Sequence, residues 1–556
     1  MIKHCMIAWV ACLLAGRAIA QEAFDRYFVA EKKYLQLPVK NGAPKRTIEI
    51  WKDGVKLRFF EMELAEQEAD WYAYLDISQW KGKKIELRVD QLSKNARSFR
   101  PILQRDEDAN EPKPYTETLR GQLHFSPKRG WTNDPNGLVY YQGQYHLFFQ
   151  HNPYGRGWGN MTWGHAVSKD LLHWTELGDV LHPDGYGPMF SGSAVVDSAN
   201  SSGLGENGNA PLVMFFTGAT CWCQGLAWTN DGLNFHKLNY APVPRVNKDN
   251  RDPKVFWYAP GKHWVMLFWV PLDDGTHTQR FFSSTNLKDW TPTGQVKGGK
   301  GDDRYLFECP DFFELPVDGN AANKKWVLSA ANTQYAIGSF DGSVFKPEQE
   351  RLQGMWGRDY YAAQTINNEP SGRRIEIGWW RTHTDKDNMG FNQSMSLPME
   401  LKLVSTPEGI RMVRLPVKEL ESLRAEQVLN GAKRVGEKTA NPLAGISADL
   451  LELQAVVEPG KVNEVRFNLN GLEFVYNVQA QEMSADGVTA KLPLVKGRLQ
   501  LSFYIDRTGV ELFANQGFVY MPINKNLNGR NCSINVVGGT AKFHQLNLYR
   551  LSSVWQ

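Results

Sequence analysis

The sequence predicts an all-β protein in which a five-bladed β-propeller stands, in chain order, between two β-sandwich-like modules. Three observations predict this fold class. Strand-like stretches run through the whole chain, a pattern recurs in its middle, and polar clusters follow the same period. The expected boundaries are residues 21–115 for the N-terminal β-sandwich-like module, 120–405 for the propeller and 425–556 for the C-terminal β-sandwich.

The two outer modules show the short strands and turn signals of β-sandwiches. The N-terminal strand candidates are residues 47–51, 57–64, 71–77 and 84–89, with turns such as Asp53-Gly54 between them. The C-terminal candidates are residues 464–469, 472–478, 499–505, 510–513 and 532–537. Residues 104–118, rich in charge and proline, predict a linker. One helix is expected at residues 417–426, where apolar residues recur every three to four positions.

The middle of the chain carries an internal repeat, in which Ser or Thr is followed by Asp or Asn and then by an aromatic residue. The aromatic positions are Trp174, Phe235, Trp290 and Phe345, at separations of 61, 55 and 55 residues. Five apolar strand candidates share this period: residues 145–150, 212–217, 264–270, 326–330 and 375–380. An all-β repeat of this length is typical of propeller blades, whereas a sandwich would have to produce the spacing by coincidence.

A polar residue comes just before the first strand expected for each unit of the repeat. These residues are Asp134, Ser191, Asp252, Glu308 and Asp359, at successive separations of 57, 61, 56 and 51 residues. The first strands of propeller blades line the central channel, so equivalent positions converge at one of its mouths. Residues far apart in the sequence are therefore expected to form one pocket rich in carboxylates.

Composition and charge exclude several classes of protein. The 556 residues include 63 basic and 60 acidic ones, and this balance argues against nucleic acid or an anionic membrane surface as the main partner. An apolar fraction of 42% and a charged fraction of 22% are those of a soluble globular protein rather than a disordered or fibrous one. No segment predicts a membrane span.

Residues 1–20 are predicted to be a secretory signal peptide. Residues 6–15 are apolar but too few to cross a bilayer, and Ala18-Ile19-Ala20 forms a cleavage site before Gln21. The expected location is periplasmic, secreted or cell-surface; the alternative is an uncleaved membrane anchor. The four cysteines that remain predict no disulfide framework, and Cys221-x-Cys223 lacks the second ligand pair of a zinc site.

Asp134, Asp252 and Glu308 form a set of acids suited to cleaving a glycosidic bond. That reaction needs a proton on the leaving oxygen and an electron donor behind the anomeric carbon, and two carboxyl groups supply both. A third carboxylate can hold substrate hydroxyls or change the pKa of its neighbour. Alone, Asp134-Pro135-Asn136-Gly137 is more often a structural turn. Three acids in register at the starts of repeat units favour catalysis.

Several short motifs follow one another in order: residues 131–137 (Trp-Thr-Asn-Asp-Pro-Asn-Gly), 149–153, 158–165, 190–193, 251–253 (Arg-Asp-Pro), 308–310 (Glu-Cys-Pro) and 361–365. Together they resemble glycoside hydrolase family 32, which holds invertases, inulinases, levanases and related fructan hydrolases. The resemblance covers residues 120–405 and continues weakly over 506–515. Thr132 departs from the pattern, since the family usually has Met there. Residues 21–115 resemble the extra N-terminal module of some gut-bacterial members.

The resemblance implies a retaining mechanism with defined roles for the three acids. Asp134 would be the nucleophile and Glu308 the general acid and then base, while Asp252 would bind fructose hydroxyls with its charge stabilised by Arg251. The implied substrate-binding residues are Trp131, Asn133, Gln150, Trp158, Phe190, Ser191, Arg251 and Trp379. For the aromatic ones, core packing is the alternative. Cys309 is expected to pack, and His124, His151 and His165 to be hydrogen-bonding wall residues.

Three functions remain open at this point. The favoured one is an exported, exo-acting fructan β-fructosidase that cleaves levan or inulin, and sucrose as a further substrate, without metal or cofactor. The second is a fructosyltransferase, in which an acceptor sugar replaces water. The third is a non-catalytic fructan-binding protein, an alternative that the three acids oppose for the propeller but not for residues 21–115.

Overall fold

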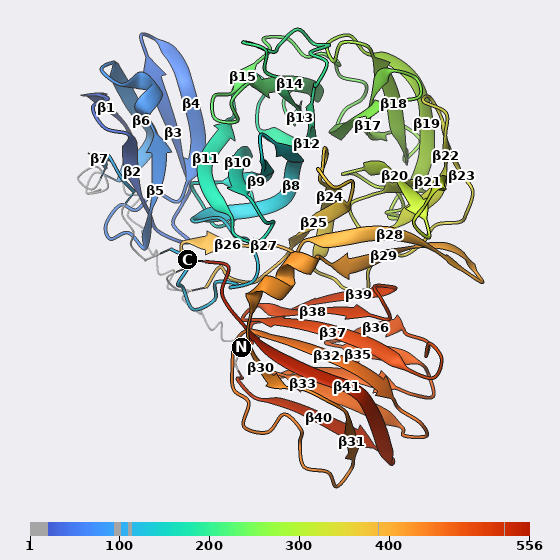
Figure 1. The fold of residues 1–556 in the computed structure, drawn as a ribbon. Coiled ribbons are helices and arrows are strands. Elements are labelled where there is room, and N and C mark those ends of the chain that lie inside the picture. The colour runs from blue at the N-terminus through green and yellow to red at the C-terminus, as the bar shows by residue number, and fades with distance from the viewer. Residues whose placement is uncertain (1–20, 94–101, 109–113, 387–388, 528, 556) are drawn as a thin grey trace, which may run out of the picture. The chain divides into compact units, whose positions relative to one another are not determined.

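The computed structural model describes the chain except residues 1–20, 94–101, 109–113, 387–388, 528 and 556 (Figure 1). The predicted signal peptide lies outside the described residues. The chain divides into two compact units, one up to Asp108 and one from Ala109 onward. Nearly all regular structure is strand, so the all-β fold class is confirmed. Among the described residues, no helix is long and apolar enough to cross a membrane.

The N-terminal unit contains two small antiparallel sheets. The first has the order β1 (Gln21–Val29), β6 (Lys84–Ser93), β3 (Arg46–Lys52), β4 (Val55–Met62); the second has the order β5 (Trp71–Asp76), β2 (Tyr34–Val39), β7 (Leu103–Arg105). Ile48 and Ile50 are buried on β3 while Glu49 between them is half-buried, as the period of two requires. Arg88 of β6 lies 4.3 Å from the ring of Trp51 on the opposite face.

The second unit begins with three sheets, each of which contains four strands that are consecutive in the chain. They are β8–β11 (Gly130–Tyr141, Gln144–Asn152, Thr162–Ser168, Thr175–Leu181), β12–β15 (Met189–Val196, Leu212–Gly218, Cys223–Thr229, His236–Lys237) and β16–β19 (Arg251–Tyr258, His263–Pro271, Thr276–Ser284, Thr291–Lys300). The five apolar stretches of the sequence fall in β9, β13, β17, β21 and β25.

A larger sheet completes this region. It joins β20–β23 (Asp311–Val317, Asn320–Ser329, Tyr335–Phe340, Phe345–Pro347) to β24 (Tyr360–Thr365), β25 (Arg374–Trp380), β28 (Met399–Thr406) and β29 (Gly409–Pro416), with β27 (Ser394–Met395) paired to β25. Asn367, just after β24, exchanges backbone hydrogen bonds with Leu138 and Tyr140 of β8. β26 (Phe391–Asn392) pairs with the start of β8. The curled sheets agree with the predicted propeller (Figure 1); closure by five blades stays a prediction.

The recurring polar–aromatic motif forms the turn before the last strand of each of the first four units. Asp170 accepts the backbone N–H of Leu172 at 3.0 Å and of His173 at 2.9 Å. Asn286 accepts the corresponding N–H groups of Lys288 and Asp289. In both turns the indole N–H of the aromatic residue closes the loop by donating to a backbone carbonyl. The repeat is therefore an Asx turn that starts a strand.

The C-terminal part of this unit packs two antiparallel sheets around one core. One sheet has the order β30 (Arg424–Leu429), β41 (Thr540–Leu551), β32 (Leu451–Glu458), β37 (Leu499–Asp506), β38 (Gly509–Ala514), β39 (Val519–Asn524), with β31 (Lys433–Gly436) on β41. The other has the order β36 (Val488–Lys491), β35 (Glu482–Ala485), β34 (Leu472–Asn477), β33 (Glu464–Leu469), β40 (Cys532–Val537). In the core the ring of Phe503 lies 5.2 Å from that of Phe467 and 5.1 Å from that of Phe474, centroid to centroid.

The helix expected at residues 417–426 is wrong in type and length. The structure has a 3₁₀ helix over Lys418–Leu423, and β30 begins at Arg424. Leu420 and Leu423 are buried three residues apart, which explains the periodicity. Arg424 instead adopts an extended backbone, and its guanidinium forms two hydrogen bonds with the buried carboxylate of Glu452. Tertiary pairing with β41 therefore overrides the local helical signal.

A buried histidine joins the propeller-like region to the C-terminal sandwich. The ring of His124 lies 2.7 Å from the Asp506 carboxylate through Nδ1 and 2.8 Å from the Glu511 carboxylate through Nε2. Asp506 also accepts the backbone N–H groups of Gln122 and Leu123. Burial alone would lower the pKa of His124, but the two carboxylates outweigh it and raise that pKa to about 9.

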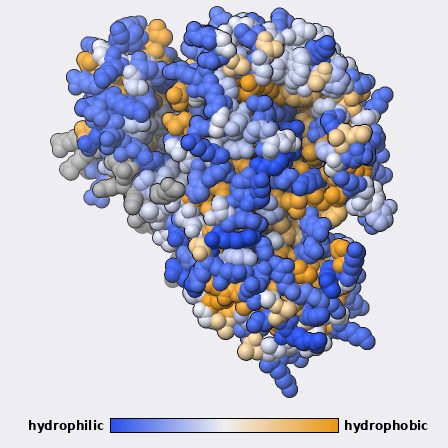
Figure 2. All heavy atoms as spheres, viewed as in Figure 1, coloured by the Kyte–Doolittle hydropathy of each residue, from blue (hydrophilic) through white to orange (hydrophobic). Residues whose placement is uncertain are grey.

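Figure 2 shows that hydrophilic residues cover most of the visible surface.

Candidate active site

Three acids and one serine of the polar repeat come together at the starts of the inner strands. Asp134 lies in β8, Ser191 in β12 and Asp252 in β16, and Glu308 comes shortly before β20. Their contacts link neighbouring units, because Asp134 meets Ser191, and Asp252 meets the residue after Glu308, each across 57 positions of sequence. Asp359, the fifth residue of the series, makes no hydrogen bond to these acids in the described part of the chain.

Asp134 is held by three side chains. Its carboxylate accepts hydrogen bonds from the Ser191 hydroxyl at 2.7 Å and from the Asn133 amide at 3.0 Å, and the Cys309 thiol lies 3.5 Å away. The turn favoured for residues 134–137 in isolation is not formed, since the whole segment belongs to β8. The register of β8 against β9 shifts between Thr132 and Pro135, so Asp134 sits in an irregular, bulged part of the strand.

Asp252 occupies a strained and almost fully buried position. Its φ is +68°, in the left-handed region that few residues other than glycine adopt, and the side chain is 4% exposed. The backbone N–H of Asp252 donates to the Thr217 hydroxyl at 3.0 Å, and its carboxylate accepts the backbone N–H of Cys309 at 2.9 Å. The neighbouring strand that contains Thr217 and the segment that contains Cys309 therefore hold the strained conformation from two sides.

Glu308 is anchored by a cation and a phenol. Arg251 donates two hydrogen bonds to its Oε2, at 2.9 and 2.7 Å, and the Tyr361 hydroxyl donates to Oε1 at 2.7 Å. The guanidinium of Arg251 also lies 4.2 Å from the ring of Trp269, which fixes its plane. Arg251 thus contacts Glu308 more closely than the neighbouring Asp252, whose carboxylate is 3.8 Å away.

Burial dominates the electrostatics of this cluster. Desolvation raises the pKa of Asp134, and the charge of Glu308 adds to that rise against the hydrogen bonds from Ser191 and Asn133. Desolvation also raises the pKa of Asp252 to about 7, although Arg251 acts in the opposite direction. The pKa of the Cys309 thiol lies well above its usual value because the thiol is buried among acids. Such perturbed groups are typical of catalytic sites.

Aromatic side chains edge the cluster in two groups. Trp158, 57% exposed, lies 6.0 Å from Phe190, and Phe190 lies 5.8 Å from Trp222, centroid to centroid. Trp131 and Trp379 form an edge-to-face pair at 6.0 Å, and the indole of Trp131 donates to Asn133 at 3.1 Å. Gln150 is buried and its amide donates to the Met189 carbonyl at the start of β12. These contacts connect the predicted subsite residues to one another and, through Asn133, to Asp134, and their binding roles stay predictions.

Comparison with known proteins identifies the family. The family model "Glycosyl hydrolases family 32 N-terminal domain" matches residues 124–416. The chain belongs to glycosyl hydrolase family 32. The expected resemblance is thereby confirmed, and with it the assignment of the chain as a glycoside hydrolase.

Relatives within family 32 are similar over most of the chain. The chain is 38% identical to the levanase of Bacillus subtilis (strain 168), covering 81% of this chain and 72% of that protein. It is 30% identical to an extracellular exo-inulinase of Aspergillus ficuum, covering 79% and 96%. The crystal structure of an exo-inulinase from Aspergillus awamori aligns with a TM-score of 0.70 at 26% identity, over 79% of this chain and 100% of that one.

Three residues of this family 32 site were not assigned a binding or catalytic role from the sequence. Tyr361 lies in a motif that supported the resemblance, but only the structure shows its bond to Glu308. Cys309 was expected to pack, yet its N–H and thiol contact Asp252 and its thiol approaches Asp134. Trp222 stands between Cys221 and Cys223, which form a disulfide across two positions. That disulfide closes the local turn that contains Trp222. The Cys-x-Cys spacing was the sequence signal that could have indicated it.

The three histidines expected to be hydrogen-bonding wall residues all hydrogen-bond through their rings. His124 bridges Asp506 and Glu511 as described above. His151 lies 2.6 Å from Asp179 and also bonds the Arg129 carbonyl. His165 pairs with His146 at 2.9 Å, and burial lowers the pKa of both. The hydrogen bonding expected of the three histidines is confirmed, and their place in the wall of the pocket stays a prediction.

Replacing Asp252 by Asn is expected to stabilise the fold near neutral pH by about 1–2 kcal/mol. Because the folded pKa of Asp252 is raised to about 7, its carboxyl costs the fold stability as the pH rises from about 4, where the unfolded group ionises, to about 7, and the whole cost remains above that pH. Asn keeps an oxygen for the Cys309 N–H but carries no charge. Denaturant unfolding at two pH values checks this: the gain in the free energy of unfolding should be large at pH 8.5 and small at pH 5. Asp289→Asn, on an exposed turn, is the control.

Proposed function

We propose that this family 32 chain is an exported fructan β-fructosidase that hydrolyses β-fructofuranosidic bonds and retains configuration at the anomeric carbon. The observation that carries the proposal is the contact network joining Asp134, Asp252 and Glu308 at the starts of neighbouring inner strands. Relatives named levanase and exo-inulinase, at 38% and 30% identity, support the substrate class.

In the first step Asp134 attacks the fructosyl anomeric carbon. A bond forms between its carboxylate oxygen and that carbon as the bond to the leaving oxygen breaks, and Glu308 gives its proton to the leaving oxygen. Ser191 and Asn133 orient the attacking carboxylate through the hydrogen bonds that they donate. The raised pKa of Asp134 marks a poorly solvated and therefore more reactive carboxylate.

In the second step water replaces the leaving group. Glu308, now a carboxylate, takes a proton from water as the hydroxide forms a bond to the anomeric carbon and the bond to Asp134 breaks. Arg251 and Tyr361 stabilise the Glu308 carboxylate while it waits for that proton. Asp252 binds sugar hydroxyls, and this interaction becomes stronger as positive charge develops on the ring. No step needs a metal or a cofactor.

The proposal includes attack at chain ends. The acids lie at the starts of inner strands, which in a propeller converge on one mouth of the central channel. A pocket there has room for the terminal fructosyl unit of a chain. Export is proposed as well, on the signal-peptide pattern of residues 1–20 and on extracellular relatives.

Product release over time from levan, inulin and sucrose tests the function. Fructose as the early product supports an exo-acting hydrolase, and β-anomeric fructose detected first by NMR supports retention. Early mixed oligosaccharides would contradict exo attack, and oligomers growing on sucrose would point to a fructosyltransferase. Absence of any product from all three substrates would contradict the function.

Trp222→Ala is expected to raise KM for sucrose about three- to tenfold with a smaller effect on kcat. Trp222 meets Phe190 edge to face, and loss of such an aromatic contact is worth about 0.5–1.5 kcal/mol. Initial rates over a range of sucrose concentrations check the result. Trp222→Phe, which keeps a ring at the position, should restore most of the affinity. An unchanged KM in the alanine variant would remove Trp222 from the subsite.

A further inference from the structure

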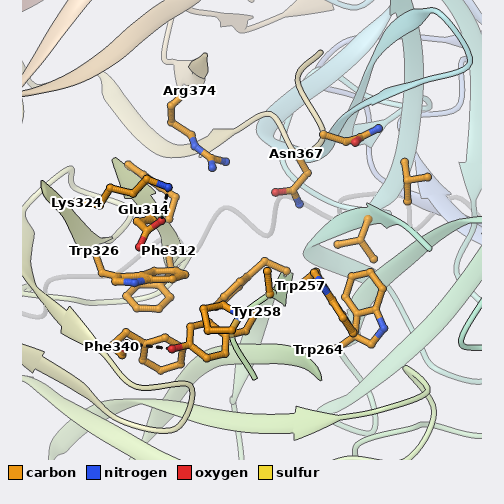
Figure 3. A pocket seen from close by; sticks show the side chains of 17 residues that line it. Trp257, Tyr258, Trp264, Phe312, Glu314, Lys324, Trp326, Phe340, Asn367 and Arg374 are labelled. Atoms are coloured by element: carbon orange, nitrogen blue, oxygen red, sulfur yellow. Dashed lines mark hydrogen bonds and ion pairs between the residues drawn. The ribbon is translucent and has the colours of Figure 1, made fainter. Parts of the chain in front are cut away.

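A cavity of about 500 Å³ (Figure 3) opens at the end of the inner strands that lies opposite the acids. Its lining includes Val196 at the end of β12 and Trp257 and Tyr258 at the end of β16, whereas Ser191 and Asp252 stand near the beginnings of the same strands. Five residues of extended strand span about 16 Å. The cavity therefore lies well away from the acids that cleave the substrate.

A buried ion pair stands between the two sites. Lys254, two residues after Asp252, lies 2.7 Å from Asp311, and their side chains are 2% and 1% exposed. Lys254 also donates to the Thr365 carbonyl on β24. These side chains fill the space between the inner strands part-way along their length. The cavity is thus a separate site and not the floor of the active site.

Aromatic rings form one side of the cavity. Trp257 is 44% exposed, which is unusual for so large an apolar side chain, and it packs edge to face against Trp264 at 5.1 Å. On the other flank Trp326 stacks on Phe312 at 4.7 Å and lies 6.1 Å from Tyr258. The buried rings of Trp264 and Phe312 hold the exposed Trp257 and the half-buried Trp326, so the orientation of both is set before any ligand arrives.

Polar groups face these rings from the opposite side. The guanidinium of Arg374 points into the cavity (Figure 3), and among the described residues its one hydrogen bond is a long one, 3.5 Å to the Ile366 carbonyl. The amide of Asn367 donates to Ala194 and keeps its oxygen for another partner. Glu314 and Lys324 form an ion pair at the edge. Hydrogen-bond donors and acceptors therefore lie opposite the aromatic rings of the cavity.

We propose that this cavity binds a second segment of the fructan chain, away from the bond being cleaved. Flat rings provide surfaces for the C–H faces of sugars, and planar Arg and Asn groups hydrogen-bond neighbouring hydroxyls. The volume lies within the usual range for small-ligand sites. Because a polymer offers many repeated units, even weak binding here raises the local substrate concentration. The inference rests on the proposed fructan hydrolysis.

Kinetics of the full-length Trp257→Ala variant on polymer and on sucrose test the proposal. KM for high-molecular-weight levan is expected to rise about three- to tenfold, while kcat and the parameters for sucrose stay unchanged, because sucrose is too short to occupy both sites. Trp257→Phe should restore the polymer KM. Leu233→Ala, at a position 66% exposed and outside the cavity lining, is the matched control.

A direct binding measurement separates this inference from the proposed function. Calorimetric titration of 1-kestose into the Asp134→Asn protein should detect two sites, of which Trp257→Ala removes one. If the wild-type chain hydrolyses levan but Trp257→Ala leaves the polymer KM and the number of sites unchanged, the second site is overturned and the function stands. An equal rise of KM for sucrose would also overturn it. Wild-type protein that cleaves no fructan would overturn the function itself.

Discussion

Asp134→Asn should reduce fructose release from levan, inulin and sucrose by at least about 10⁴-fold, since loss of a nucleophile removes the covalent route. Asn is close in shape to Asp and can still accept the hydrogen bond from Ser191, so the site keeps its geometry. The amide oxygen is far less nucleophilic than the carboxylate. Fructose release measured over hours with matched amounts of wild type and variant checks the loss.

A comparison of two variants on two substrates distinguishes the nucleophile from the general acid. Glu308→Gln should lose much of its rate on sucrose but far less of its first step on an aryl fructoside, because an activated leaving group needs no proton. Asp134→Asn should be equally inactive on both substrates. Asp289→Asn controls for the loss of one surface carboxylate and should keep full activity. An active Asp134→Asn variant would transfer the nucleophilic role to another residue and refute the assignment.

The second large effect concerns stability. Replacing His124 by Leu is expected to lower the free energy of unfolding by about 3–5 kcal/mol, because two carboxylates lose their shared cation inside the protein. Asp506 keeps the N–H bonds from Gln122 and Leu123, and Glu511 keeps bonds from the Leu397 N–H and the Tyr520 hydroxyl. Denaturant unfolding followed by tryptophan fluorescence measures the change, since Trp380 lies 4.2 Å from His124, ring to ring.

This contribution depends on pH with a defined sign. The folded pKa of His124 is raised to about 9, so its stabilisation is complete below about pH 6.5 and is lost as the pH rises through 9. The pKa of Asp506 is lowered, so its part is lost on the acid side. Wild type should therefore weaken between pH 7 and pH 10, and the variant should show a flatter profile.

A surface histidine provides the control for this pair of experiments. His173 bonds Asp170 at 2.7 Å, but both side chains are more than a third exposed, so His173→Leu should cost less than about 1 kcal/mol. An unfolding free energy of His124→Leu equal to that of wild type at pH 7 would contradict a role for the buried imidazolium at the junction.

Local pattern predicted most strands because alternation and turn residues are local properties. Residues 464–469 and 532–537 coincide with β33 and β40, and the recurring Asp or Asn is an Asx turn whose bonds span only two or three residues. The segment 417–426 failed for the opposite reason. There the partner strand β41 is more than a hundred residues away, and its hydrogen bonds outweigh a weak local preference.

The sequence by itself determined the all-β class, the repeat and which acids come together, because each follows from residue type and spacing. Tertiary structure decided what each acid touches. The hydrogen bond from Ser191 to Asp134, the two bonds from Arg251 to Glu308 and the bond from the Cys309 N–H to Asp252 all span 57 residues. Such partners meet only where neighbouring inner strands converge.

The cavity lined by Trp257 and the contact of Trp222 with Phe190 also arise only when the sheets pack. Trp257 and Arg374 lie on different sheets more than a hundred residues apart, and no pattern in either strand indicates the other. Burial, desolvation and the resulting pKa of Asp252 likewise depend on every element packed around the site. Residue type and spacing are written along the chain, whereas distance and dielectric environment exist only once the sheets have packed.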